Sequence, residues 1–317
     1  MNSSPLGMID AGLVFGMAPS LVNSALLPMR RIKKFGRGTH FSKESKKEKT
    51  MPATQLQFYQ VGSYPYPYAT TGTGSALTVC RRYNDPYLAF LTQTSYEDEI
   101  VFLYLHLSVA KEAGRLQTPP GHDVISGMDY AIFRNIIWAV QSTQNQDTII
   151  GIDPETGVVT DTILVPPRSG AALAYNGLYF VRSDGNVLEA ISNSGVVIGT
   201  VNVPLGSSVQ GLTAAPWSYV ASDTGRNRLL VLNVFGNIIA KCPNPPGAAG
   251  GITAVAYDNI LDFDQISQLP TENGAWGAPG TPYHPDTLWN PAPWMMRHNI
   301  YLANELDQTI YFGYFYE

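Results

Sequence analysis

An adjacent histidine and aspartate, His122 and Asp123, are the residues of this sequence best placed for acid–base chemistry. With Arg168, and with Asp129 close by, they supply an imidazole, two carboxylates and a guanidinium, which can hold a small anion or a polar group. They do not amount to a metal cage, because hard cations need six or more oxygen ligands. We therefore expect no metal and no cofactor. In the alternative interpretation, His122 and Asp123 only cap a turn.

Aromatic residues form a second group that is suited to binding. Between residues 265 and 298, a Pro/Gly-rich stretch carries Trp276, Tyr283, His284, Trp289 and Trp294. Aromatic side chains in a long loop offer rigid contact area for a protein or a glycan. Equally, these tryptophans can fold back over neighbouring strands. Both interpretations stay open at this stage.

Other chemical patterns are weak. The sequence contains no Gly-x-Ser-x-Gly elbow for a serine hydrolase. Cys80 and Cys242 are far apart, and nothing near either of them suggests an activated thiol. Asp258, Asp262 and Asp264 have spacing that can chelate Ca²⁺ from a strand, but three surface acids in an acidic protein are the simpler explanation.

A repeat in the sequence indicates which elements carry these residues. Proline-rich joints recur roughly every 40 to 47 residues, and each precedes a Gly/Ser-rich approach to an apolar run. Two or three further short β-rich runs follow within each unit, separated by turn residues. The joints are Pro119-Pro120, Pro166-Pro167, Pro204 and Pro245-Pro246. Four short strands per unit are typical of a β-propeller blade, so we predict an all-β propeller of four-stranded antiparallel sheets.

Five blades are the first expectation for this propeller, and six, with one degenerate blade in the 265–298 insertion, are the alternative. The last unit lacks an outer strand, and Gln55 to Val61 alternate suitably to supply it. The N-terminal strand would then pair with the C-terminal blade and close the ring. The connectors that contain His122, Asp123 and Arg168 would line one mouth of the central channel.

One segment resembles a known repeat. Tyr219 to Asn233, followed by Gly236, is similar to an NHL repeat, with departures at Ser222 and Arg226. The resemblance covers about 15 residues well. It implies a propeller in which Asp223-Thr224-Gly225 makes a turn and an arginine packs between blades. It implies nothing about a substrate.

Charge divides the chain into two parts. Residues 30–49 hold nine of the 20 lysines and arginines, so from Met51 onward 11 basic and 22 acidic residues remain, a net charge of −11. We expect a basic, disordered arm over residues 1–50 and the propeller over residues 51–317. The arm has no standard secretory signal, because its basic residues follow the apolar stretch. A membrane anchor with a basic flank and a non-native upstream extension are the alternatives for it.

These observations favour a non-catalytic binding propeller that holds a protein or carbohydrate partner, as a component of a larger assembly or surface. The alternative is a hydrolase, similar to propeller lactonases or glycosidases, with its site at the channel mouth. The acidic propeller argues against nucleic acid as its partner, whereas the basic arm suits a membrane or another acidic surface. Compartment and oligomeric state stay open.

Overall fold

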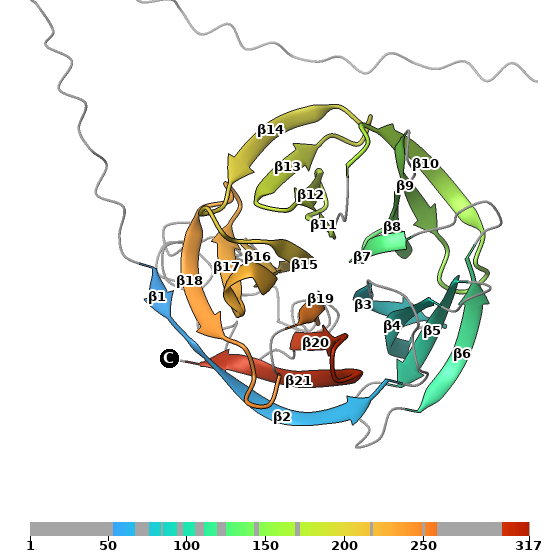
Figure 1. The fold of residues 1–317 in the computed structure, drawn as a ribbon. Coiled ribbons are helices and arrows are strands. Elements are labelled where there is room, and N and C mark those ends of the chain that lie inside the picture. The colour runs from blue at the N-terminus through green and yellow to red at the C-terminus, as the bar shows by residue number, and fades with distance from the viewer. Residues whose placement is uncertain are drawn as a thin grey trace, which may run out of the picture. The chain divides into compact units, whose positions relative to one another are not determined.

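The protein is an all-β ring of five blades arranged about a central channel (Figure 1). The computed structural model describes residues 53–66, 76–83, 85–93, 98–104, 111–118, 125–142, 146–168, 172–215, 218–248, 251–258 and 300–316. No helix in these ranges is long and apolar enough to cross a membrane. The predicted arm over residues 1–50 lies outside them.

Each blade is an antiparallel sheet of four strands, and in the first four blades these strands follow one another in the chain from the channel outward. The first blade consists of β3 (Leu77–Arg82), β4 (Asp85–Gln93), β5 (Asp98–Tyr104) and β6 (Glu112–Gln117). The second consists of β7 (Ile125–Ala131), β8 (Ile136–Ser142), β9 (Asp147–Ile152) and β10 (Val159–Val165). The third consists of β11 (Leu173–Tyr175), β12 (Phe180–Asp184), β13 (Val187–Ile191) and β14 (Val197–Asn202).

The remaining two blades complete the ring. The fourth consists of β15 (Val209–Ala215), β16 (Ser218–Asp223), β17 (Arg228–Asn233) and β18 (Ile238–Pro243), with the 3₁₀ turn η1 (Thr224–Arg226) between its second and third strands. The fifth consists of β19 (Ile252–Tyr257), β20 (Ile300–Asn304), β21 (Thr309–Tyr316) and β2 (Gln57–Pro65). Five blades are thereby confirmed, and so is closure by the N-terminal strand.

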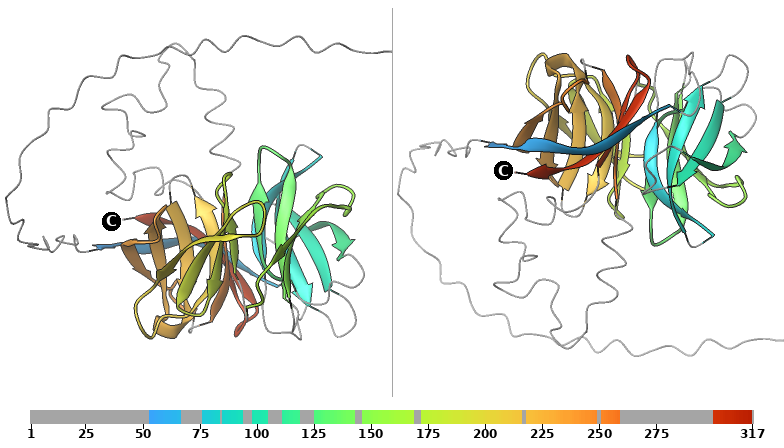
Figure 2. Two further views of the ribbon diagram at one scale, coloured as in Figure 1. Left: turned by 90° about the horizontal axis from the view of Figure 1, so that it is seen from above. Right: turned by 90° about the horizontal axis from the view of Figure 1, so that it is seen from below.

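The N-terminal strand joins two blades. The short strand β1 (Thr54–Gln55), which precedes β2 in the chain, pairs in parallel with β18 of the fourth blade. Next to it, the Leu56 N–H donates to the carbonyl of Lys241 at 2.8 Å. The chain then continues as β2, which pairs with β21 of the fifth blade. Figure 2 shows β2 running along the outside of β21. The sequence analysis predicted the pairing with the last blade but not the contact with the fourth. It also did not assign β6, whose alternation of charged and small residues hides its strand character.

The core lies between the blades. Most residues of the three inner strands are buried on both faces, and the apolar clusters combine side chains from neighbouring sheets. The largest cluster joins the first, second and fifth blades. A single blade therefore has no core of its own, which is why its strands are apolar throughout instead of alternating.

A register shift recurs at the start of three innermost strands, β7, β15 and β19. The register shifts by one residue between Ile125 and Gly127 and again between Val209 and Gly211. In the fourth blade the Gly211 N–H donates to the Ser222 hydroxyl at 2.7 Å, and in the third the Ala172 N–H donates to Ser183 at 3.0 Å. A bulge bends a strand. These inner strands therefore bend where the chain enters the channel from the connectors.

Glycines in the turns before the outermost strands connect adjacent blades. Gly157, Gly195 and Gly236 all have φ between 74° and 84°, a conformation that favours glycine. A side chain at each position would meet the outer strand of the preceding blade, at Leu116, Leu164 and Val201 respectively. The turn chemistry that marks each blade in the sequence therefore also positions it against its neighbour.

Candidate functional site

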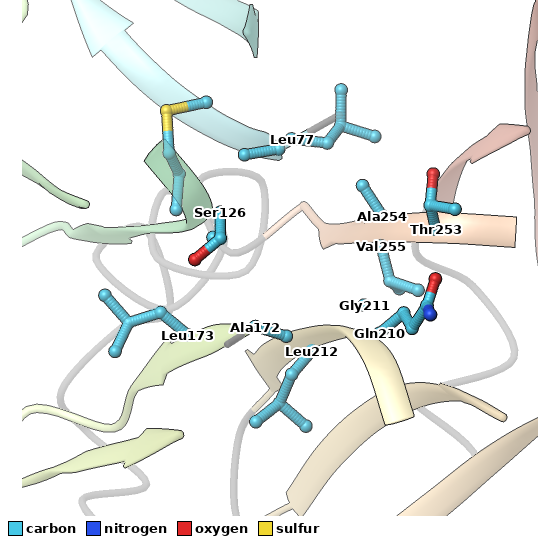
Figure 3. A pocket seen from close by; sticks show the side chains of 13 residues that line it. Leu77, Ser126, Ala172, Leu173, Gln210, Gly211, Leu212, Thr253, Ala254 and Val255 are labelled. Carbon is cyan, nitrogen blue, oxygen red and sulfur yellow. The ribbon is translucent and has the colours of Figure 1, made fainter. Parts of the chain in front are cut away.

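The central channel contains a small cavity near the starts of the innermost strands (Figure 3). All five blades line it. The lining residues are Ala76, Leu77, Ser126, Gly127, Met128, Ala172, Leu173, Gln210, Gly211, Leu212, Thr253, Ala254 and Val255. The space open to a water-sized sphere is about 10 Å³, which suits roughly one water molecule.

The described lining of this cavity is chemically inert. None of its side chains ionises, and its polar groups are the hydroxyls of Ser126 and Thr253 and the amide of Gln210. In Figure 3 the Gln210 amide lies beside Thr253, on the opposite side of the cavity from Ser126. These groups can orient a water molecule, but they supply neither a general acid nor a nucleophile.

The predicted site residue Arg168 belongs to an ionic cluster between the second and third blades. Its guanidinium donates to Glu189 at 2.7 Å and lies 3.6 Å from Asp184, while its backbone N–H donates to Asp147 at 2.8 Å. Arg182, which is fully buried, donates to Asp147 and to Glu189, both at 2.8 Å. The charge of Arg168 is thus already compensated by Glu189 and Asp184.

The charges in this cluster hold each other in the ionised state. Burial by itself raises the pKa of Glu189, but hydrogen bonds from Arg168 and Arg182 outweigh it, so the pKa is lowered. The same contact with Glu189 raises the pKa of Arg168. A carboxylate held ionised between two guanidinium groups is a poor general acid, and the cluster is best explained as a tie between blades.

Asp129 ties three blades together beyond the cavity. Its carboxylate accepts backbone N–H bonds from Tyr175 of the third blade at 2.7 Å and from Ala214 of the fourth at 3.1 Å. It also accepts from the backbone of Tyr130 at 3.0 Å and from the Thr213 hydroxyl at 3.3 Å. Burial raises the pKa of Asp129 to about 7, although these four hydrogen bonds act in the opposite direction. The group is inaccessible, so its role is structural.

The other predicted site residues are not brought together by the described part of the chain. His122 and Asp123 lie outside the described residues, and so do Trp276, Tyr283, His284, Trp289 and Trp294. Asp262 and Asp264 lie outside as well, while Asp258 is fully buried at the end of β19, so it is not the surface acid that the sequence suggested. Within the described ranges no three histidine, cysteine or acidic residues gather as metal ligands.

Both cysteines are buried in the core. Burial raises the pKa of the Cys242 thiol to about 12 and that of the Cys80 thiol still further. Burial therefore makes both thiols poor nucleophiles at neutral pH.

A set of exposed apolar side chains lies on the face of the ring at which the innermost strands end, which we call the turn face. These residues occupy the tight turns of four blades, and their exposed fractions are 61%, 82%, 76% and 69% for Tyr83, Phe133, Leu178 and Phe235. Adjacent turns are linked, since the Tyr179 hydroxyl donates to the Val234 carbonyl at 3.1 Å. Sequence reasoning missed this surface because its residues come from separate turns that are far apart in the sequence.

The fold resembles that of known propellers. The glutaminyl cyclase of Myxococcus xanthus superposes with a TM-score of 0.53 at 14% identity, over 83% of this chain and 98% of that one. A streptogramin B lyase gives a TM-score of 0.41 at 14% identity, over 64% and 78%. Virginiamycin B lyase from Staphylococcus aureus gives 0.36 at 13%, over 63% and 78%. At these identities the likeness concerns the fold alone.

No family model matches the chain, and no curated protein does. The similarity of Tyr219–Asn233 to an NHL repeat therefore stays a prediction. Locally, Thr224 to Arg226 do form a turn, and the Arg228 guanidinium lies 3.0 Å from Asp223 within the same blade.

Proposed function

We propose that this chain is a binding propeller, which holds a protein or glycan partner within a larger assembly or surface and catalyses no reaction itself. The observation that carries the proposal is the turn face. Apolar side chains from four blades are more than half exposed on this one face, and exposed apolar side chains gathered in a patch mark an interaction surface. β19 ends and β20 begins at this same face, and the predicted aromatic insertion lies between these two strands in the sequence.

The channel supports the proposal as well. A catalytic site needs groups that exchange protons or attack a substrate, and the described lining offers two hydroxyls and one amide around a space of about 10 Å³. Two ionisable groups close to it in the chain, Asp129 and Arg168, are engaged in ties between blades. The acidic propeller also suits a partner other than nucleic acid, while the basic residues within 30–49 suit a membrane or another acidic surface.

The experiment compares two faces of the same ring. In a partner-capture assay with the full chain, Phe133→Ser, Leu178→Ser and Phe235→Ser are combined in one variant. The matched control combines Leu205→Ser and Leu306→Ser, which are equally exposed on the connector face, where the innermost strands begin. We expect capture to be lost in the first variant and kept in the second. Equal capture by both would contradict the proposal.

The same material tests the hydrolase alternative. Lactone and glycoside substrates are incubated with the full chain and with His122→Ala. Turnover that disappears in the variant would establish a site at the channel mouth and would overturn the non-catalytic proposal.

A further inference from the structure

Three tyrosines form a contiguous surface on the outer two strands of the fifth blade. Tyr59 on β2 lies opposite Tyr314 on β21, and Gln57 lies opposite Tyr316. The rings of Tyr59 and Tyr314 stack with centroids 5.0 Å apart, and Tyr316 meets Tyr59 edge-on at 6.3 Å. The Tyr316 hydroxyl donates to the Gln57 side chain at 2.6 Å. We call these four residues the tyrosine rim.

The sheet beneath holds the tyrosine rim in place. Phe58 and Phe315 point to the opposite side of the same strands, where they pack edge-to-face in the core at 6.2 Å. Gly313 lies beside the carbonyl of Tyr59, so that a side chain at this position would push the strands apart. Because alternation along a strand is strict, the buried phenylalanines fix the tyrosines outward. The surface is thus organised before any partner arrives.

The tyrosine rim is both open and uncharged. The exposed fraction of Tyr59 is 52%, and that of Val61, which follows on the same strand, is 54%. Tyr59 keeps this exposure although its ring contacts both Tyr314 and Tyr316. Neither β2 nor β21 contains a charged residue, although the propeller as a whole is strongly acidic.

These properties select the chemistry of the partner. The apolar C–H face of a pyranose ring stacks on an exposed aromatic face, and tyrosine hydroxyls and glutamine amides pair with sugar hydroxyls. Phosphate and sulfate groups call for arginine or lysine, and single-stranded nucleic acid needs a basic groove in addition to aromatic rings. The tyrosine rim supplies stacking and neutral hydrogen bonding, which matches an uncharged sugar.

We infer that the tyrosine rim is a binding surface for a neutral polysaccharide. The inference deepens the proposed function, since it rests on a binding role and assigns a carbohydrate to a surface separate from the turn face. No covalent step is involved, and the bound sugar would lie along the outside of the ring.

The test uses the full chain in pelleting assays with microcrystalline cellulose, chitin and granular starch. We expect retention by at least one of them, with Tyr59→Ala binding about tenfold more weakly and Tyr59→Phe, which keeps the ring, binding within about twofold of the original. Tyr104→Ala is the matched control. Tyr104 is a 40% exposed tyrosine that also pairs with another tyrosine, Tyr87, but Lys111 lies over its ring. This control is expected to bind fully.

Several outcomes would overturn the inference. They are the absence of retention by all three polysaccharides, equal binding by Tyr59→Ala and the original chain, and retention by heparin, single-stranded DNA or a proline-rich peptide alone. The variant Phe133→Ser separates the two proposals, because it alters the turn face and leaves the tyrosine rim intact. If no polysaccharide binds the tyrosine rim but a partner is still captured through the turn face, this inference is refuted and the proposed function stands.

Discussion

At the scale of single residues, this propeller uses its buried charges as ties between blades. Asp129 collects four hydrogen bonds from three blades, and Arg182 spans Asp147 and Glu189 across a blade interface. Such groups cost desolvation, so they stabilise a structure only when every partner is in place. Removing one partner leaves the rest buried and uncompensated, which makes them more sensitive to substitution than surface pairs.

Asp129→Asn tests this at the centre of the ring. Because an amide cannot accept all four hydrogen bonds, we expect the free energy of unfolding to fall by about 2–4 kcal/mol at pH 7. The matched control is Asp161→Asn, which removes a carboxylate that pairs with Arg134 at the surface and should cost under about 1 kcal/mol. Urea denaturation of both variants measures the difference.

The pH dependence of this difference has a defined sign. Burial raises the pKa of Asp129 to about 7 from 3.8, so the folded state holds its proton more tightly than the unfolded chain does. The stability that this carboxyl contributes is therefore full below pH 4 and declines as the pH rises to 7. We expect the gap between the original chain and Asp129→Asn to widen on acidification from pH 7 to 4. A gap that narrows would show that the four hydrogen bonds govern the charge of this group.

At the scale of elements, the turns connect the blades as much as they reverse the chain. Gly195 lies in the turn before β14 and packs against the Leu164 carbonyl of the preceding blade, at a φ of 84°. Gly177 has a similar φ of 92°, but a side chain there would meet nothing within 4 Å. Substitutions at these two positions therefore distinguish the cost of backbone strain from the cost of disturbed packing between blades.

We expect Gly177→Ala to lower the free energy of unfolding by about 1–2 kcal/mol through strain alone. Gly195→Ala should cost about 1–3 kcal/mol more, because its methyl group also displaces the neighbouring strand. Chemical denaturation midpoints, measured side by side, give both values. Equal losses would mean that the contact between blades contributes nothing.

At the scale of the whole molecule, the repeat of turn and strand residues was sufficient to predict five blades, the inner strands and the closing strand. Prediction failed where local composition carries no information. β6 is partly charged, the pairing of β1 with β18 depends on two residues, and the tyrosine rim joins positions more than 250 residues apart. Arg168 was identified as a charged group near the mouth, but its partner Glu189 belongs to another strand and could not be read from the sequence.

Ring closure gives the prediction at this scale. A chain that starts at Ala53 keeps β1 and β2, whereas one that starts at Tyr66 loses both and leaves β21 as an open edge. We expect the first to unfold in one cooperative transition and the second to aggregate or melt without cooperativity. Calorimetry and light scattering distinguish them, and a peptide of residues 53–66 added in trans should partly rescue the shorter chain. Cooperative melting of the shorter chain would contradict this role of the closing strand.

The pairing of β1 and β2 with the fourth and fifth blades also determines when the ring can close during synthesis. Gln57 leaves the ribosome early, yet its partner Tyr316 is synthesised 259 residues later. At about 5–20 residues per second, the first strand waits on the order of tens of seconds with Leu56 and Phe58 exposed. A nascent chain of this kind offers a chaperone a long window for engagement, and it completes its fold only after the C-terminal strand has emerged.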